Sequence, residues 1–316
     1  MVIGVLDRAS LGMDTPISML EEFGKIRVYD RSSSTEVLER VSGIDVLIIN
    51  KIKVTREVIE RADSLKLICV FATGYDGIDI DAAREYGIGV CNVPGYSTDS
   101  VVLFTVATAL SLVSHLTEYN RFVRSGEYTS SGFANRLTPV YHEVRGMTWG
   151  IVGCGNIGGA VARVAEAMGA RVLAFKRTPD PRYNCTDLET LCRESDIITV
   201  HCPLSDSTRG LIGKEQLALM KPTAILVNEA RGAVLDEEAV AEAVLSRSIG
   251  GFGCDVYSTE PFGTDHPYSK IKDLDNVLLT PHAAWGAYES RVRCLSIICD
   301  SIRAYIRGET LNRVDK

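Results

Sequence analysis

The sequence predicts an α/β fold with two doubly wound parallel-sheet domains. Short runs of Val, Ile and Leu alternate with longer helical patterns, and this alternation starts again behind a glycine-rich motif near the middle of the chain. Continuous apolar strands separated by helices favour a parallel sheet that is covered on both faces. With 316 residues, the chain is long enough to build two hydrophobic cores.

The first half of the chain carries the first of these alternations. It opens directly on an apolar run without the basic region and cleavage pattern of a secretion signal, so we expect a first strand there. Further apolar runs follow, and helical patterns separate them. The expected strands are residues 2–6, 27–29, 46–49, 67–70 and 88–91, and the expected helices are residues 35–41, 55–62 and 80–86.

The glycine motif at residues 153–158 lies between an apolar run at residues 148–152 and an Ala/Val-rich segment that ends at Gly169. This order predicts a strand, a tight turn and a helix. The first glycine permits the turn, the second lets a pyrophosphate approach the backbone, and the third lets helix and strand pack closely. The context favours a Rossmann dinucleotide site over an ordinary turn. The expected cofactor-binding residues here are Gly153, Gly155, Asn156, Ile157 and Gly158.

About half of the chain precedes this motif, which is enough for a separate domain. A last helical segment at residues 290–306 follows the final strand of the second domain, and we expect it to return to the first. We therefore expect a first domain of residues 1–98 plus 287–316 and a second of residues 99–286. The strands expected after the motif lie near residues 171–175, 197–201, 224–228, 251–255 and 277–280.

Two segments before the glycine motif stand out. The apolar run at residues 101–113 contains Thr and Ser and is too short to span a bilayer, so we interpret it as a buried helix, with His115 in the same helix. Residues 125–144 read as an irregular connection of a length that often forms a protruding arm.

Composition narrows the class of partner. The net charge of −7 argues against nucleic acid or an anionic membrane as the main partner. The nine cysteines lack a paired C-x-x-C and a His-rich cluster, so we expect neither a disulfide framework nor a metal site. A reducing cytoplasm fits this pattern best.

Three polar residues follow successive strands of the second domain. Arg231, Glu260 and His282 each come at or just beyond the end of an expected strand, and open parallel sheets bind ligands at that edge. A guanidinium can hold a carboxylate and polarise a neighbouring carbonyl. A histidine beside a carboxylate keeps a proton near neutral pH. With a nicotinamide supplying hydride, these groups could reduce a 2-keto acid.

Each of these residues also has a plainer interpretation. Arg before Gly is commonly a surface or capping residue, Glu-Pro is commonly a turn, and Pro-His can close a loop. Their joint occurrence behind a dinucleotide motif favours the catalytic interpretation. For His115, His142 and His266 we expect packing or solvent contacts, and for the cysteines, including Cys154 in the glycine loop, burial as small apolar residues.

Taken together, these motifs resemble a known family. Residues 228–232 (NEARG), 255–261 (DVYSTEP) and 280–282 (TPH) resemble the three catalytic signatures of the D-isomer-specific 2-hydroxyacid dehydrogenases, in the same order. Residues 72–79 resemble that family's loop for the substrate carboxylate. Residues 92–99 and Trp285 are most similar to its glycerate dehydrogenase and hydroxypyruvate reductase branch.

The resemblance implies a flavodoxin-like substrate domain, a Rossmann cofactor domain and a cleft between them. It implies that the substrate is bound by the Gly74 and Tyr75 backbone together with Arg231, His282 and Trp285. It also implies a homodimer joined through the cofactor domain, with residues 125–144 as an exchanged arm. Further cofactor contacts are implied for Thr98, His201, Pro203, the carbonyl of Ala230, and Asp255.

One departure from the family concerns the cofactor. NAD-preferring members carry an acid after the second cofactor-domain strand to bind the ribose 2′-hydroxyl. Here Lys176, Arg177 and Thr178 occupy that place. Two cations and a hydroxyl favour a 2′-phosphate, so we expect NADP(H) to be preferred, with NAD(H) possible. The alternative is that the two cations are a solvated strand end.

The resulting hypothesis is an oxidoreductase that moves a hydride between NAD(P)H and a small 2-keto acid. Hydroxypyruvate or glyoxylate, reduced to D-glycerate or glycolate, fits the branch resemblance. Two alternatives stay open: a dehydrogenase for a bulkier or phosphorylated 2-hydroxy acid, and a corepressor-like protein that senses the cofactor. Arg231, Glu260 and His282 favour an enzyme, because binding alone does not need a Glu-supported histidine.

Overall fold

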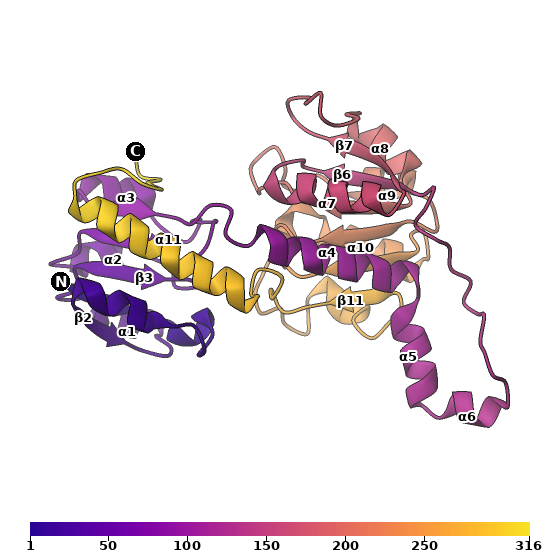
Figure 1. The fold of residues 1–316 in the computed structure, drawn as a ribbon, viewed down its shortest axis with the longest axis horizontal. Coiled ribbons are helices and arrows are strands. Elements are labelled where there is room, and N and C mark those ends of the chain that lie inside the picture. Colours follow the sequence, from indigo (N-terminus) through magenta and orange to yellow (C-terminus); the bar gives the residue numbers. More distant parts are fainter. The chain divides into compact units, whose positions relative to one another are not determined.

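The computed structural model describes all residues from Met1 to Lys316 and divides the chain into two compact units (Figure 1). The first unit consists of Met1–Ser97 and Gly286–Lys316, and the second consists of Thr98–Trp285. Each unit contains one wholly parallel sheet with helices on both faces. The predicted α/β class with two parallel-sheet domains is therefore confirmed.

The first unit has a five-stranded sheet in the order β2-β1-β3-β4-β5, which is the flavodoxin-like arrangement. Neighbouring strands are parallel throughout; for example, Val46 pairs with Leu67. The interior strands β3 and β4 are buried at every residue, which is why they read as continuous apolar runs. The strands are β1 (Val2–Val5), β2 (Lys25–Val28), β3 (Val46–Ile49), β4 (Leu67–Val70) and β5 (Gly89–Cys91).

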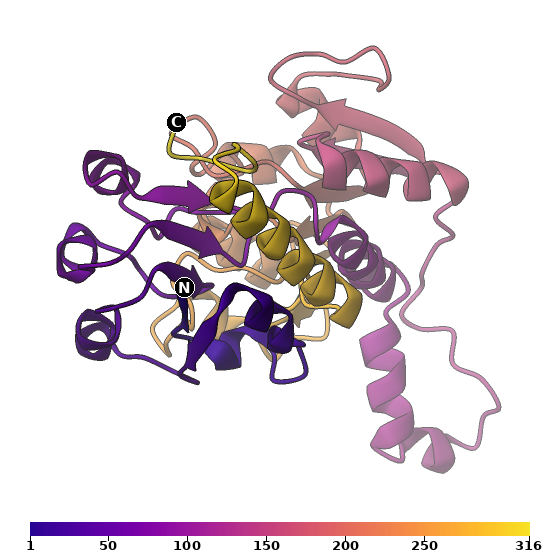
Figure 2. The same ribbon diagram turned by 60° about the vertical axis from the view of Figure 1, so that its left-hand side comes forward.

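Helices α1 (Ser34–Arg40), α2 (Arg56–Arg61) and α3 (Ile80–Glu85) pack on one face of this sheet, and α11 (Tyr288–Ile306) lies across the other (Figure 2). Helix α1 starts where Ser33 forms a capping box with Glu36. The long α11 comes from the second segment of the unit. The second face of this sheet is therefore covered largely by a helix from the last segment of the chain, which packs there beside residues 17–23.

Two details of the first unit differ from the sequence-based expectation. The second strand, expected at residues 27–29, begins at Lys25, because Gly24 turns the chain and the Lys25 N–H bonds to the Met1 carbonyl at 3.0 Å. Two 3-10 helices, η1 (Arg8–Leu11) and η2 (Ile17–Phe23), follow β1 and were not expected. Such short segments carry no helical period in the sequence.

The second unit has a six-stranded parallel sheet in the order β11-β10-β9-β8-β6-β7. Beyond β7, an isolated parallel bridge from Ala174 to Cys185 extends the sheet by one more contact. The chain order reverses between β6 and β8, and such a switch point is where doubly wound sheets bind ligands. The strands are β6 (Thr148–Val152), β7 (Arg171–Phe175), β8 (Ile197–Val200), β9 (Ile225–Asn228), β10 (Gly251–Cys254) and β11 (Val277–Leu279).

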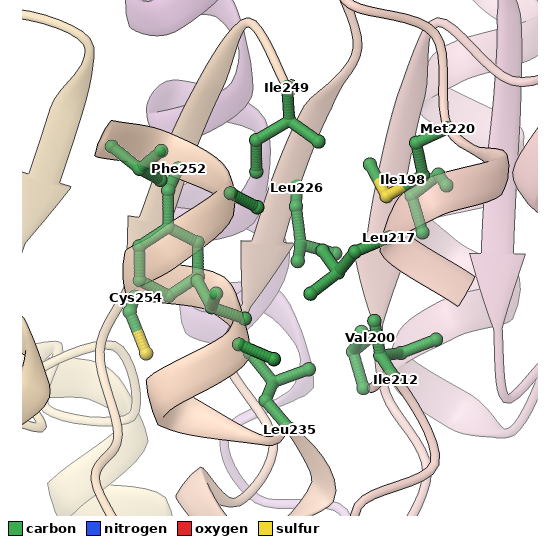
Figure 3. Close-up of a cluster of buried hydrophobic side chains, with 14 of the residues drawn as sticks. Ile198, Val200, Ile212, Leu217, Met220, Leu226, Leu235, Ile249, Phe252 and Cys254 are labelled. Atoms are coloured by element: carbon green, nitrogen blue, oxygen red, sulfur yellow. The ribbon is translucent and has the colours of Figure 1, made fainter. Parts of the chain in front are cut away.

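Helices α4 (Thr98–Val113) and α7 (Asn156–Ala167) cover one face of this sheet. The other face carries α8 (Leu188–Glu194), α9 (Lys214–Leu219), α10 (Glu237–Leu245) and the 3-10 helix η4 (Pro267–Lys270). Along β9 the side chains alternate between the two cores, so Leu226 packs toward α9 and α10 while Val227 packs toward α4. Figure 3 shows the first of these cores, with Leu226 and Phe252 among its members.

The expected irregular segment at residues 125–144 contains a short helix, α6 (Glu127–Ser131), which follows α5 (Leu116–Arg124). The expectation for His115 is also wrong. It lies between α4 and α5 with a left-handed φ of 51°, because the chain bends there instead of continuing one helix. No single helix is long and apolar enough to cross a membrane; α4 and α5 pass that test only as a pair bent by 66°.

Candidate functional site

The glycine loop joins β6 to α7. Gly153 has a φ of +98°, and a Cβ atom there would lie 2.7 Å from the backbone nitrogen of Cys202, which follows β8. A Cβ atom on Gly158 would lie 2.1 Å from the carbonyl oxygen of Gly153. These two glycines are therefore required by a left-handed turn and by close packing of the helix against it.

Gly155 has a different environment from the other two glycines. It is the N-cap residue of α7, no side chain caps the helix, and nothing lies within 4 Å of the place where its Cβ would be. The first helical residues, Asn156 and Ile157, thus begin α7 beside open space. Uncapped N–H groups at a helix N-terminus attract anions, so this loop fits the pyrophosphate of a dinucleotide.

The cationic segment after β7 contains an acid that the sequence analysis did not consider. Lys176 Nζ lies 2.9 Å from Asp180 Oδ2, and Arg182 Nη2 lies 2.7 Å from the same oxygen. Hydrogen bonds from Arg182 and Lys176 lower the pKa of the Asp180 carboxyl. Arg177 and Thr178 are exposed, and Lys176 is partly buried. The segment therefore carries three cations, two of which pair with one carboxylate. The spacing of Lys176 and Asp180 by four residues was the available signal.

His201 and Pro203 follow β8, next to the backbone against which Gly153 packs. Both ring nitrogens of His201 are buried and have no hydrogen-bond partner, and burial lowers its pKa to about 3. The imidazole is therefore neutral at physiological pH. The Pro203 carbonyl accepts a hydrogen bond from Thr208 Oγ1 at 2.6 Å. Thr98, another expected cofactor contact, is the first residue of α4.

Arg231 follows β9 in a turn that Asn228 holds in place. The Asn228 amide donates to the Arg231 carbonyl at 3.0 Å, and its oxygen accepts the Ala230 N–H at 3.1 Å. Arg231 Nη1 donates to the Ala230 carbonyl at 2.8 Å. A Cβ atom on Gly232 would lie 2.1 Å from the carbonyl carbon of Tyr257, so the turn packs directly on the loop after β10.

Asp255, expected to contact the cofactor, is 1% exposed and anchors the loop after β11. Its carboxylate accepts hydrogen bonds from Thr280 Oγ1 at 2.6 Å and from the N–H groups of Ala283 and Ala284 at 2.8 Å. Its carbonyl accepts the His282 N–H at 2.8 Å. The sequence analysis did not foresee this loop-anchoring contact, which needs the two strand ends to be neighbours.

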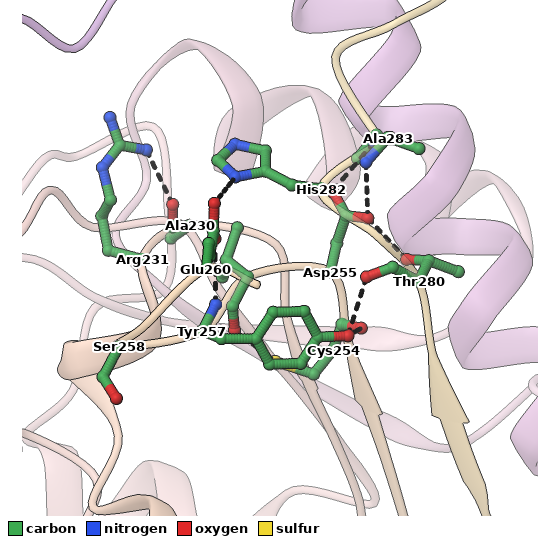
Figure 4. Close-up of polar contacts among 12 residues, drawn as sticks. Ala230, Arg231, Cys254, Asp255, Tyr257, Ser258, Glu260, Thr280, His282 and Ala283 are labelled. Carbon is green, nitrogen blue, oxygen red and sulfur yellow. Dashed lines mark hydrogen bonds and ion pairs between the residues drawn. The ribbon is translucent and has the colours of Figure 1, made fainter. Parts of the chain in front are cut away.

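His282 and Glu260 form a direct pair. His282 Nδ1 lies 2.6 Å from Glu260 Oε2, and the other oxygen of Glu260 accepts the Tyr257 N–H at 3.1 Å. Both side chains are partly exposed, at 27% and 29%. Figure 4 shows Arg231 and His282 on the same side of the strand ends, with the Glu260 carboxylate next to the imidazole. A carboxylate on Nδ1 orients the ring so that Nε2 can carry a transferable proton.

The remaining expected substrate contacts belong to separate units. Gly74 and Tyr75 lie in the loop after β4 of the first unit, where Thr73 Oγ1 donates to the Val93 carbonyl at 2.8 Å. Tyr75 is exposed. Trp285 is the last residue of the second unit, three residues after His282.

The sequence analysis gave no role to Glu229, which precedes Ala230. It is 7% exposed; Oε1 lies 3.4 Å from Thr108 Oγ1, and Oε2 has no hydrogen-bond partner. Burial and the charge of Asp255 raise the pKa of Glu229 to about 8. This carboxyl is therefore mostly protonated at neutral pH, which avoids a second buried charge next to Asp255.

A glycine loop for a dinucleotide, together with a carboxylate-supported imidazole and a guanidinium at the strand ends of the same sheet, defines an oxidoreductase that uses a nicotinamide cofactor. The chain belongs to the D-isomer specific 2-hydroxyacid dehydrogenase family, because residues 106–284 match the NAD binding domain of that family. Its cofactor is a nicotinamide dinucleotide.

Relatives support the same assignment over the whole chain. The chain is 36% identical to hydroxypyruvate reductase of Blautia hydrogenotrophica over 305 residues, which cover 94% of each chain. It is 36% identical to glycerate dehydrogenase of Methylorubrum extorquens over 315 residues, which cover 98% of each. The structure of D-lactate dehydrogenase from Aquifex aeolicus with NAD and lactic acid matches with a TM-score of 0.87 and 28% identity, covering 100% of this chain and 99% of that one. The predicted family and its dehydrogenase activity are confirmed.

Replacing Glu229 by Gln tests the buried carboxyl. The folded protein holds its proton up to about pH 8, whereas the unfolded chain releases it near 4.5. The free energy of unfolding of wild type therefore falls as the pH rises from 4.5 to about 8, by on the order of a few kcal/mol. Gln cannot ionise, so we expect the free energy of unfolding of Glu229→Gln, measured with urea, to fall less than that of wild type between pH 5 and pH 9. The exposed variant Glu238→Gln should follow wild type, and parallel curves for all three proteins would refute the assignment.

Proposed function

We propose that this protein reduces small 2-keto acids to D-2-hydroxy acids, with hydroxypyruvate and glyoxylate as the best substrates. The observation that carries the proposal is the 2.6 Å contact between His282 and Glu260 at the strand ends of the cofactor unit. Two curated relatives with whole-chain similarity, a hydroxypyruvate reductase and a glycerate dehydrogenase, support this substrate class.

The cofactor, when bound, supplies the hydride. Arg231 binds the substrate carboxylate with its planar fork of donors and polarises the adjacent carbonyl. His282 gives its Nε2 proton to the carbonyl oxygen, and Glu260 stabilises the charged imidazole beforehand. The backbone N–H groups of Gly74 and Tyr75 also bind the carboxylate, and Trp285 shapes the substrate site.

The remaining cofactor contacts are proposed in the second unit. The helix start at Gly155, Asn156 and Ile157 binds the pyrophosphate, as its open N-cap position allows. Thr98 and the His201–Pro203 segment line the nicotinamide and ribose. The Ala230 carbonyl and Asp255 contact the carboxamide.

Steady-state kinetics with hydroxypyruvate, glyoxylate and larger 2-keto acids test the function. We expect wild type to turn over the two small acids fastest. His282→Ala should lower kcat by roughly 10²- to 10⁴-fold, because it removes the general acid. Arg231→Ala should raise KM as well as lower kcat. Absence of turnover in wild type would favour a cofactor-sensing role, and near-normal kinetics of His282→Ala would remove His282 from the acid role.

We further propose that NADP(H) is preferred over NAD(H). Lys176, Arg177 and Arg182 give this segment three positive charges against the single carboxylate of Asp180, which suits a 2′-phosphate.

The ratio of kcat/KM for NADPH and NADH measures this preference. We expect wild type to favour NADPH. Arg177→Ala should lose roughly ten- to a hundredfold in kcat/KM for NADPH, because a charge-assisted contact is worth roughly 1.5–3 kcal/mol. The same variant should leave kcat/KM for NADH unchanged. A strong wild-type preference for NADH would contradict the proposal.

We also propose a homodimer in a reducing, cytoplasmic environment. The nine free cysteines support that environment. Residues 116–144, which comprise α5 and the expected arm at residues 125–144, support the dimer, since large apolar side chains there are exposed and would be covered by a second copy. These side chains are Leu116, Val123, Phe133, Leu137, Val140 and Tyr141.

Light scattering coupled to size exclusion tests the dimer. We expect wild type to elute with the mass of two chains and Phe133→Glu to shift toward one, because a charge would be buried in the interface. Tyr86→Glu, at an exposed position of the first unit, serves as the control. A monomeric wild type would rule out the proposal.

A further inference from the structure

Glu237, in the first turn of α10, is hydrogen-bonded to the loop that carries Glu260. Its Oε1 accepts the Ser258 N–H at 2.8 Å, and its Oε2 accepts the Ser258 hydroxyl. The Glu237 side chain is only 10% exposed. These two hydrogen bonds, both donated by Ser258 to a nearly buried carboxylate, fix the backbone two residues before Glu260.

His266 supports Glu237 from the other side. Its Nε2 lies 3.0 Å from Glu237 Oε2, and its Nδ1 accepts the Tyr268 N–H at 3.2 Å. Because Nδ1 is an acceptor, the proton of the neutral ring sits on Nε2 and is donated to Glu237. The His266 side chain is 7% exposed and packs against the rings of Phe262 and Tyr268, with centroids 4.9 and 5.0 Å away.

Tyr257 connects this cluster to both members of the catalytic pair. Its N–H bonds to Glu260, and its hydroxyl donates to the Thr280 carbonyl at 2.7 Å, two residues before His282 (Figure 4). Its ring packs against those of Phe262 and His266, with centroids 4.7 and 6.1 Å away. A shift of the Tyr257–Ser258 backbone would therefore move the Glu260 and His282 loops together.

We propose that Glu237, supported by His266 and acting through Ser258, is a positioning residue for the Glu260–His282 pair. The inference rests on the proposed function of that pair. Glu237 does not touch the reacting atoms; it sets the place of the Glu260 carboxylate relative to the imidazole. Because proton transfer depends steeply on geometry, a loosened loop should slow the chemical step and leave substrate binding nearly unchanged.

The substitution Glu237→Gln removes one acceptor while keeping the shape of the side chain. Two groups around Glu237 can only donate: the Ser258 N–H, which faces Oε1, and the His266 Nε2–H, which faces Oε2. Whichever way the Gln amide lies, its NH2 group meets a donor. Glu238 is the matched control, since it is the next residue, lies in the same helical turn and forms an exposed ion pair with Lys270.

A double-mutant cycle between Glu237→Gln and Glu260→Gln tests the inference. In the wild-type background we expect Glu237→Gln to lower kcat about ten- to a hundredfold, with KM for the 2-keto acid and Kd for the cofactor within about twofold. In the Glu260→Gln background the same substitution should cost less than about twofold, because the carboxylate it positions is already gone. Glu238→Gln should retain the kcat of wild type.

Ser258→Ala gives a milder test if Glu237→Gln folds poorly. It removes one hydroxyl and keeps the Glu237–His266 pair, so we expect a smaller loss of kcat, and Ser258→Thr should restore it. Equal losses of kcat in both backgrounds, or a folded Glu237→Gln with unchanged kcat, would overturn the inference. If Glu260→Gln itself keeps the kcat of wild type, the proposed role of the pair fails instead, so the two failures are distinguishable.

Discussion

The anchoring of the loop after β11 by Asp255 is the constraint on which the site depends. A buried carboxylate is costly unless donors surround it, and here all three donors come from the segment that carries His282. The same segment holds His282 at a φ of +53°, a backbone region that is unfavourable for a side chain with a Cβ. The hydrogen bonds to Asp255 offset that cost. The backbone of His282 is therefore fixed, and its imidazole lies within hydrogen-bond distance of the Glu260 carboxylate.

The parallel sheet explains why residues far apart in the sequence share this edge. β9, β10 and β11 are adjacent and run in the same direction, so their carboxyl ends lie side by side. Arg231, Glu260 and His282 follow those three strands in turn. The loops also pack closely against one another. At Gly232, for example, the backbone lies so near the Tyr257 carbonyl carbon that no side chain would fit. The helices supply the outer supports, of which Glu237 at the start of α10 is one.

Local patterns in the sequence were sufficient for the strands, the glycine loop and the three residues at the strand ends, because period and order along the chain determine them. What they could not provide are contacts between segments that only folding brings together. His266 was expected to make packing or solvent contacts, yet it hydrogen-bonds to Glu237, 29 residues earlier in the chain. The burial of Glu229 likewise follows from the packing of α4 on β9, which no local pattern encodes. His115 was misplaced because neither Gly nor Pro marks the bend at Ser114 and His115, where α4 ends.

The first unit is assembled from both extremities of the chain, with α11 covering one face of its sheet and Val314 bonded to the Val90 carbonyl at its edge strand. During synthesis, the strands of this unit leave the ribosome first but lack that cover until the last residues are made. The second unit is one continuous stretch of the chain, so all of its residues have been synthesised before α11 is made. The first unit therefore begins to emerge before the second but is completed after it, and its nascent sheet exposes the apolar face that α11 later covers.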